Sequence, residues 1–268
     1  MKDLSKIKLI VSDFDGTLLN WEKKCITDRT VKIINNLSKR NKLFVIATAR
    51  PWYALKPYIK KIQRSVEFFI LCNGAWIKKN NGEDLFLNFI SKNAILRIVK
   101  KWWDNKDVRF MLISKNETFI NRFSPHKYIR NYQIMLNSKI ISKEKVSQNA
   151  EKIFNIEVDA SLSLLKMITK DLNKNEVTFT FSWPEFLEIY SKKISKGKAL
   201  ERLCKYLNVK KEEILAFGDG NNDLELLKKA GFGVAMANST SEMKNNADYV
   251  TSNCNEDGVA FFIENFIC

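Results

Sequence analysis

Residues 9–20 read LIVSDFDGTLLN, and this stretch decides the fold. A short apolar run ends in Asp13 and Asp15, and a Gly-Thr pair follows. An apolar run of this length, bounded by turn residues, predicts a buried β-strand that stops at the aspartates. If strand geometry continues that far, both carboxylates point the same way, and a cation between them would relieve their repulsion. Taken alone, the stretch fits either a binding site or a solvated turn.

Similar apolar runs recur in the first eighty residues and again near the end of the chain, separated by helical patterns. Thr27 or Asp28 is expected to cap the first helix, since both side chains accept hydrogen bonds at helix starts. Continuous apolar strands that alternate with helices predict a parallel sheet covered on both faces. Strands are expected within 8–14, 42–50, 67–75, 213–220 and 232–237, and helices within 27–40, 53–62, 195–208 and 222–231.

The middle of the chain has a different pattern, in which strands cluster with few helices. One helix is expected at 92–103, and strands are expected at 108–114, 117–121, 163–169 and 177–183. Such clustering is typical of an α+β insert. The predicted fold class is therefore α/β, with a Rossmann-like parallel sheet core and an inserted α+β cap domain. The core is expected to comprise 1–82 and 187–268, and the cap 83–186.

Polar residues follow the predicted parallel strands at their carboxyl ends, where such sheets bind ligands. Carboxylates of this kind suit Mg²⁺, and hydroxyl or backbone N–H groups suit phosphate oxygens. Lys196, just before a helix, is the natural positive partner. These strand ends are expected to gather Asp13, Asp15, Thr48, Asn73, Asp219, Asn222 and Asp223.

The motifs DFDGTLL, ATAR, CNGA, ISKGKAL, GDGNNDLELLKKAG and GVAMANS follow one another along the chain. In type, order and spacing they resemble the haloacid dehalogenase (HAD) superfamily of phosphohydrolases, and within it the Cof-like sugar-phosphate phosphatases with a large inserted cap. The likeness covers both core segments nearly end to end, whereas the middle segment matches only in general pattern.

That resemblance implies roles for several residues. Asp13 would be the nucleophile that forms an aspartyl-phosphate, and Asp15 would protonate the leaving alcohol and then activate water. Thr48, Ala49 and Lys196 would hold the phosphate, with Asn222 orienting groups nearby, while Arg50 and Asn73 are possible substrate contacts. Mg²⁺ would be held by Asp13, the main-chain carbonyl of Asp15 and Asp219, with Asp223 in support.

Departures from the family pattern concern the surroundings of the site. Ala49 replaces the glycine of the usual TGR, and Ala237 that of the usual MGN. Arg50 could meet the cap or substrate, or a neighbouring carboxylate. In the cap, Arg109, Arg122, Trp183 and the SPHKY loop at 124–128 are candidates for contact with the leaving group, and the sequence does not rank them.

Composition limits the classes of partner. The chain of 268 residues carries 45 Lys and Arg against 30 Asp and Glu, a net charge of +15. The lysines are spread along the chain without a recognition-helix motif, so nucleic acid is not the expected partner. No membrane span or signal peptide is recognisable, and five scattered cysteines suit a reducing compartment. A cytoplasmic monomer or homodimer acting on a small phosphomonoester is expected.

Three functions compete at this stage. The first is a Mg²⁺-dependent phosphatase of small phosphomonoesters such as sugar phosphates. Nucleotides and pyridoxal phosphate are further possible substrates. The second is a sugar-phosphate phosphomutase, which would need cap cations to hold a second phosphate. The third is an inactive binding or regulatory relative, which the complete set of expected catalytic groups disfavours.

Overall fold

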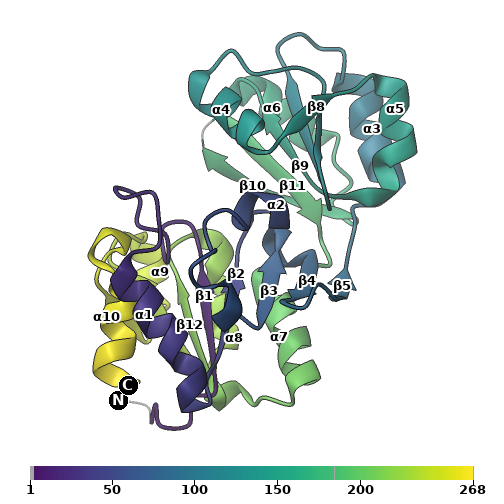
Figure 1. Cartoon of the computed structure of the whole chain (residues 1–268). Coiled ribbons are helices and arrows are strands. Elements are labelled where there is room, and N and C mark those ends of the chain that lie inside the picture. Colours follow the sequence, from purple (N-terminus) through teal and green to yellow (C-terminus); the bar gives the residue numbers. More distant parts are fainter. Residues whose placement is uncertain (1–2, 184, 268) are drawn as a thin grey trace. The chain divides into compact units, whose positions relative to one another are not determined.

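The computed structural model describes residues 3–183 and 185–267, with backbone only for 182 and 183. The side chain of Trp183, a candidate for contact with the leaving group, therefore lies outside the described residues. The chain divides into two compact units (Figure 1). Unit 1 comprises 1–50, 55–87 and 195–268 within these described residues, and unit 2 comprises 51–54 and 88–194. The expected boundaries at 82/83 and 186/187 were therefore too early. Residues 84–87 pair with a strand of unit 1, and residues 186–191 pair with a strand of unit 2. Each of these strands belongs to the unit whose sheet supplies its backbone hydrogen bonds.

Unit 1 contains an eight-stranded sheet in the order β14-β13-β12-β1-β2-β3-β4-β5. The first six strands of that order are parallel, as predicted, and β4 and β5 extend the edge in antiparallel fashion. The strands are β1 (Leu9–Asp13), β2 (Leu43–Ala47), β3 (Phe68–Leu71), β4 (Trp76–Lys79), β5 (Asp84–Leu87), β12 (Ile214–Gly218), β13 (Phe232–Met236) and β14 (Tyr249–Thr251).

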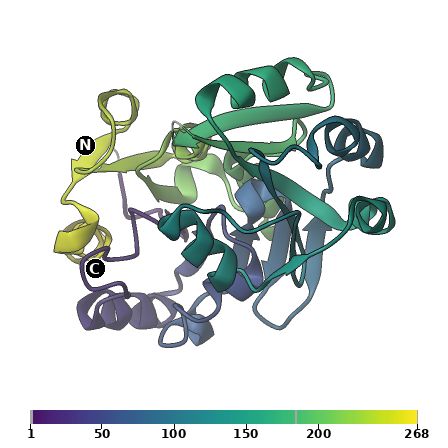
Figure 2. The same cartoon turned by 90° about the horizontal axis from the view of Figure 1, so that it is seen from above.

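Helices cover both faces of this sheet because the strand residues are apolar on both sides. Leu9 and Val11 pack with Leu200 of α7, whereas Phe217, on the alternate face, packs against Phe262 of α10. Figures 1 and 2 show α10 beside α1, where Arg29 and Glu264 form an ion pair. The helices of unit 1 are α1 (Asp28–Leu37), α7 (Lys196–Leu207), α8 (Leu224–Lys229), α9 (Ser241–Asn245) and α10 (Gly258–Phe266). The short helix α2 (Trp52–Leu55) lies almost entirely in the 51–54 segment that belongs to unit 2.

Local signals explain where these helices begin and end. Thr27 is the cap of α1, and its side chain accepts from the Thr30 backbone N–H. Ser195 caps α7 in the same way, and Asn208 ends that helix in a left-handed conformation. The helix expected at 53–62 stops at Leu55, because a residue that precedes proline, here Lys56 before Pro57, avoids helical geometry.

Unit 2 contains a six-stranded sheet in the order β10-β11-β9-β6-β7-β8, in which β7 and β8 alone are parallel. Its strands are β6 (Arg109–Ser114), β7 (Thr118–Ile120), β8 (Ser138–Ile140), β9 (Ile153–Asp159), β10 (Val177–Trp183) and β11 (Phe186–Ser191). Its helices are α3 (Lys92–Trp102), α4 (Lys127–Met135), α5 (Lys143–Asn149) and α6 (Leu162–Lys170).

The α+β class of the insert is confirmed, but α6 lies where a strand was expected, and β8, β9, β11, α4 and α5 were not predicted. The strand expected at 163–169 is the helix α6, in which Leu165 and Ile168 face the core. A short apolar run is ambiguous between helix and strand when only the sequence is known. The fully buried β9, which pairs with both β6 and β11, was not predicted at all.

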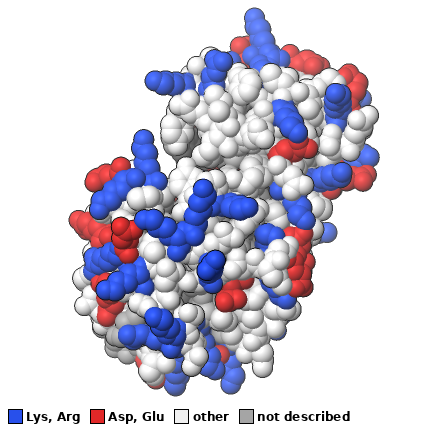
Figure 3. Space-filling model, in the orientation of Figure 1, with Lys and Arg blue, Asp and Glu red and all other residues white. Residues whose placement is uncertain are grey.

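Charged side chains cover each unit in mixed fashion. On the face drawn in Figure 3, Lys and Arg are interspersed with Asp and Glu, in keeping with their spread along the sequence. Within the described part of the chain, no helix combines the length and the hydropathy needed to cross a membrane. None of the four described cysteines is part of a disulfide.

Candidate active site

Asp13 is the last residue of β1 and lies at the carboxyl edge of the unit 1 sheet. Its side chain is almost fully buried, with 4% of the residue exposed. Phe14 turns into the core, and Gly16 closes the turn at a φ of +79°. A Cβ at Gly16 would lie 2.3 Å from an oxygen of Asp219, so only glycine fits there. The turn thus places the strand end against the loop that carries Asp219.

Lys196 opens α7 and points its ammonium into this edge. Its Nζ donates to Asp13 Oδ1 at 2.5 Å and to Asp223 Oδ1 at 2.7 Å, with only 2% of the residue exposed. Burial alone would lower the pKa of Lys196, but the carboxylates of Asp13 and Asp223 outweigh it and raise the pKa above its ordinary value. Lys196 therefore stays charged and links the two carboxylates.

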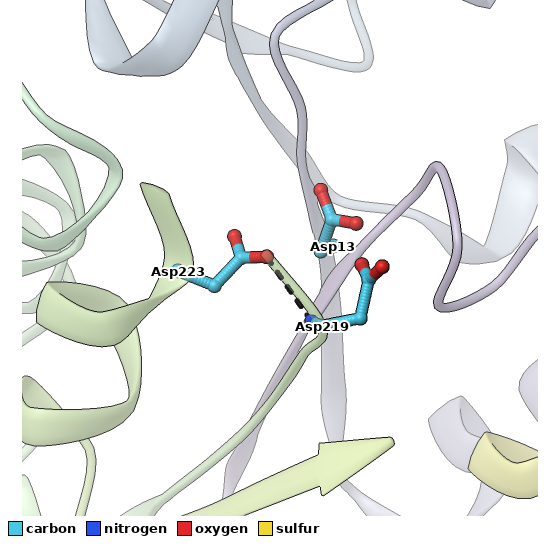
Figure 4. A group of neighbouring side chains, drawn as sticks. All are labelled: Asp13, Asp219 and Asp223. Carbon is cyan, nitrogen blue, oxygen red and sulfur yellow. Dashed lines mark hydrogen bonds between the residues drawn. The ribbon is translucent and has the colours of Figure 1, made fainter. Parts of the chain in front are cut away.

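Asp219 follows β12, and Asp223 ends the next short helical segment, η6 (Asn221–Asp223). Asp223 Oδ2 accepts from the backbone N–H of Asp219 at 3.2 Å and of Gly220 at 3.1 Å. Thr17 Oγ1 donates to Asp219 Oδ1 at 3.0 Å. Figure 4 shows the carboxyl groups of Asp13, Asp219 and Asp223 directed toward one another. One oxygen from each lies within 4.8 Å of the others.

This group of side chains carries more negative than positive charge. Three buried or partly buried carboxylates face the single ammonium of Lys196. Burial and the neighbouring Asp223 raise the pKa of Asp13 well above its ordinary range, and the same causes raise that of Asp219 to about 6. A divalent cation would offset the repulsion between these carboxylates. Carboxylate oxygens are also the ligands that Mg²⁺ prefers. The donor set therefore fits Mg²⁺.

Thr48, Ala49 and Arg50 follow β2 at the same edge. Thr48 is fully buried, and its Oγ1 accepts from the Arg50 backbone N–H at 3.1 Å. Arg50 Nε and Nη2 donate to the two oxygens of Asp15 at 2.8 and 2.6 Å. The guanidinium also lies over the rings of Phe14 and Tyr58. Of the two partners left open for Arg50, the structure shows the neighbouring carboxylate. Asp15 accordingly turns to Arg50 rather than continuing the strand beside Asp13.

Asn73, in the short helical segment η3 (Cys72–Gly74) that follows β3, meets Asn222 of η6 at this edge. Asn222 Nδ2 donates to Asn73 Oδ1 at 3.1 Å, although the strands that precede them are far apart in sequence. Asn73 has a left-handed φ of +54°, which asparagine tolerates better than most residues. The two amides therefore bridge the strand ends on one side of the carboxylates.

One polar residue at this site was missed. Asn238, two residues after β13, donates through Nδ2 to the Gly16 carbonyl at 2.8 Å and to Asp219 Oδ2 at 3.4 Å. Its Oδ1 accepts from the Cys254 backbone N–H at 3.0 Å. The signal was present in the sequence, because Asn238 follows a buried strand just as Asp219 does. Asn238 ties the β1 turn, Asp219 and the loop at Cys254 to one another.

Comparison with known proteins places this chain among phosphatase-like sequences. A family model described as haloacid dehalogenase-like hydrolase matches residues 10–263. A protein of Buchnera aphidicola (subsp. Schizaphis graminum), named "Putative phosphatase", is 32% identical over 97% of this chain and 96% of its own. The 5-amino-6-(5-phospho-D-ribitylamino)uracil phosphatase YcsE of Bacillus subtilis is 28% identical, with 97% and 96% covered.

A solved structure has the same fold over nearly the whole length. It is a haloacid dehalogenase-like hydrolase from Bacteroides thetaiotaomicron, with a TM-score of 0.84 and 26% identity. The match covers 96% of this chain and 98% of that one. Both units, and not only the sheet that carries the aspartates, are therefore matched in known proteins.

Proposed function

The chain belongs to the haloacid dehalogenase-like hydrolases and is a phosphatase, and from this premise we propose that it hydrolyses small phosphomonoesters with Mg²⁺. Sugar phosphates are the favoured substrates, and the reaction runs through an aspartyl-phosphate on Asp13. The observation that carries the proposal is the buried Asp13 carboxylate, held by Lys196 at 2.5 Å and faced by Asp219 and Asp223.

In the first step, a carboxylate oxygen of Asp13 attacks phosphorus while the bond from phosphorus to the leaving oxygen breaks. Asp15 gives its proton to that oxygen, so the alcohol leaves neutral. In the second step, water attacks the phosphorus of the aspartyl-phosphate and loses a proton to Asp15, while the bond between phosphorus and the Asp13 oxygen breaks. Inorganic phosphate leaves, and the Asp13 carboxylate is regenerated. Arg50 donates to both oxygens of Asp15, so one of these two hydrogen bonds must be released before that carboxyl can present a proton.

Lys196 has two tasks in this scheme. Its charge favours the ionised form of Asp13 that the attack requires, and its ammonium is available to phosphate oxygens beside Thr48. Asp13, the main-chain carbonyl of Asp15 and Asp219 would hold Mg²⁺, with Asp223 in support. The ion would supply positive charge that offsets the repulsion between an anionic carboxylate and an anionic phosphate.

The test is phosphate release from a panel of hexose phosphates, nucleoside monophosphates, pyridoxal phosphate and p-nitrophenyl phosphate, each with Mg²⁺ and with EDTA. Asp13→Asn, which keeps the shape but removes the nucleophile, should lose turnover by at least about 10³-fold. Asp28→Asn is the matched control, because Asp28 is an exposed aspartate of unit 1 that pairs with Lys61. Full turnover by Asp13→Asn, or no release from any substrate, would contradict the proposal.

A further inference from the structure

Unit 1 carries a cavity of about 430 Å³ with a basic lining. Two loops form its walls: residues 24–26, just before α1, and residues 57–61, which follow α2 in the chain. Neither Lys196 nor any of the three carboxylates grouped with Asp13 lines it. The cavity is therefore a second candidate site, separate from the one at which hydrolysis is proposed. Its lining includes Lys24, Cys25, Ile26, Tyr58, Lys60 and Lys61.

The lysines of this cavity are not matched by carboxylates in its lining. Lys24, Lys60 and Lys61 supply three positive charges, and no Asp or Glu is among the lining residues. Of these three lysines, Lys61 alone has a carboxylate partner in the described chain, namely Asp28 at 2.7 Å, and water screens that exposed pair. Like charges gathered in a concave surface focus their field on an incoming counter-ion. The lining therefore fits an anion.

The backbone at Lys24 has an unusual conformation. Its φ is +53°, in the left-handed region that glycine or asparagine adopts with less strain. The turn is closed by a bridge in which the Asn20 backbone N–H donates to the Cys25 carbonyl at 3.1 Å. Asn20 Oδ1 also accepts from the Lys23 backbone N–H at 2.8 Å. A lysine at a position whose backbone favours other residues points to a use for its side chain.

The second wall is fixed to the body of unit 1. Ile59 is fully buried, and the Lys61 carbonyl accepts from Asn35 Nδ2 of α1 at 3.3 Å. Tyr58 belongs both to this wall and to the surroundings of Arg50, whose guanidinium lies 4.6 Å from the centre of its ring. Both walls are thus preformed, and a ligand that enters the cavity orders little additional backbone.

We infer that this cavity binds the phosphate group of a small anion through Lys24, Lys60 and Lys61. A phosphate group offers up to two negative charges and several acceptor oxygens, which suits a cluster of ammonium donors. The volume lies in the range of small-molecule sites, and Ile26 and the Tyr58 ring offer apolar contact to an organic body. Inorganic phosphate and a phosphorylated organic compound share this chemistry. Binding here requires no turnover, so the inference goes beyond the proposed hydrolysis.

The Cys25 thiol is a local probe, because it lines the cavity and is the exposed one among the described cysteines. Its alkylation by iodoacetamide, a neutral reagent, is followed by peptide mapping in EDTA, which keeps phosphate esters intact. Inorganic phosphate and phenyl phosphate are the competitors, and each rate is compared with that in sodium chloride at equal ionic strength. A bound competitor should slow alkylation about fivefold or more, since ten times the dissociation constant leaves about a tenth of the sites free.

A double variant, Lys24→Met with Lys60→Met, removes two of the three charges and should abolish this protection. The matched control is Lys39→Met with Lys244→Met, which changes the net charge equally at lysines of unit 1 outside the cavity and should retain it. Protection at a lower concentration of phenyl phosphate than of inorganic phosphate would identify an organic phosphate as the ligand, and the reverse order would identify the free ion.

Two results would overturn the inference. One is equal alkylation of Cys25 in phosphate, phenyl phosphate and chloride, which would reduce the lysine cluster to a screened surface charge. The other is protection that survives in the Lys24→Met, Lys60→Met variant, which would place the anion elsewhere. Neither result bears on hydrolysis at Asp13, because the measurement is made without the metal and without turnover.

Discussion

The carboxyl edge of the unit 1 sheet and the polar face of the unit 2 sheet both bury carboxyl groups, but they stabilise them differently. At the first, Lys196 bonds Asp13 and Asp223, and two backbone N–H groups bond Asp223. At the second, where alternation along β9 directs Asn155 and Glu157 away from the apolar core, the described donors to Glu157 are the neutral groups of Asn155 and Tyr132. The contrast indicates that the first edge is organised for charged groups, whereas the second surrounds its carboxyl with neutral groups.

Removal of Lys196 tests the contrast most severely. Lys196→Met should lower the free energy of unfolding by about 3–5 kcal/mol at neutral pH, because two carboxyls stay buried without their cation. Urea denaturation in EDTA measures this. Lys229→Met is the control, since Lys229 pairs with Glu201 at the surface and should cost under about 1 kcal/mol. Equal costs for the two variants would show that the ion pairs of Lys196 do not stabilise this edge.

Glu157→Gln should raise the free energy of unfolding, where Lys196→Met lowers it, and the size of the gain should depend on pH. The pKa of Glu157 is about 8 in the folded protein and near its ordinary 4.5 when unfolded. Between these values the unfolded chain has released a proton that the folded protein keeps, so wild-type stability falls as pH rises, by up to about 1.4 kcal/mol per unit. Glu157→Gln lacks this loss of stability. Its free energy of unfolding should therefore rise relative to that of wild type between pH 5 and 8.

Denaturation of both proteins at half-unit pH steps measures that difference. The free energy of unfolding of Glu151→Gln, a change at an exposed site, should vary with pH as that of wild type does. A difference between Glu157→Gln and wild type that stays flat with pH would mean that Glu157 ionises normally, and the contrast between the two regions would disappear.

Addition of Mg²⁺ should act on the first region alone. With one ammonium for three carboxylates, the edge of unit 1 should gain about 1.4 kcal/mol at a Mg²⁺ concentration ten times the dissociation constant. Thermal unfolding in a Mg²⁺ titration reports this gain. Asp219→Asn should abolish most of it and Glu157→Gln should not. A gain that survives in Asp219→Asn would place the cation elsewhere.

Asn238 should modulate the same site more weakly. Asn238→Ala frees Asp219 Oδ2 and the Gly16 carbonyl, so Mg²⁺ affinity should fall about tenfold, the usual effect of losing a residue that orients a metal ligand. Calorimetry with Mg²⁺ measures it without turnover. Asn265→Ala, on the exposed side of α10, is the control and should bind as wild type does.

Much of unit 1 could be predicted from the sequence, and less of unit 2. The parallel strands of unit 1 are continuous apolar runs that end in polar turns, so each run predicts a buried strand by itself. In unit 2, the run at 163–169 could be a helix or a strand, and only packing against the sheet decides for α6. The unpredicted β9 depends on pairing with β6 and β11, which lie far away in the chain.

The sequence by itself determined the fold class, the family resemblance and the set of polar residues that the strand ends present. It could do so because a parallel sheet delivers every strand end to one edge, whatever the intervening segments do. Only the tertiary structure decided how those residues pair: that Arg50 holds Asp15, that Lys196 bridges Asp13 and Asp223, and that Glu157 is buried with an oxygen unpaired. Pairing depends on distances between side chains from separate elements, and no local pattern encodes those distances.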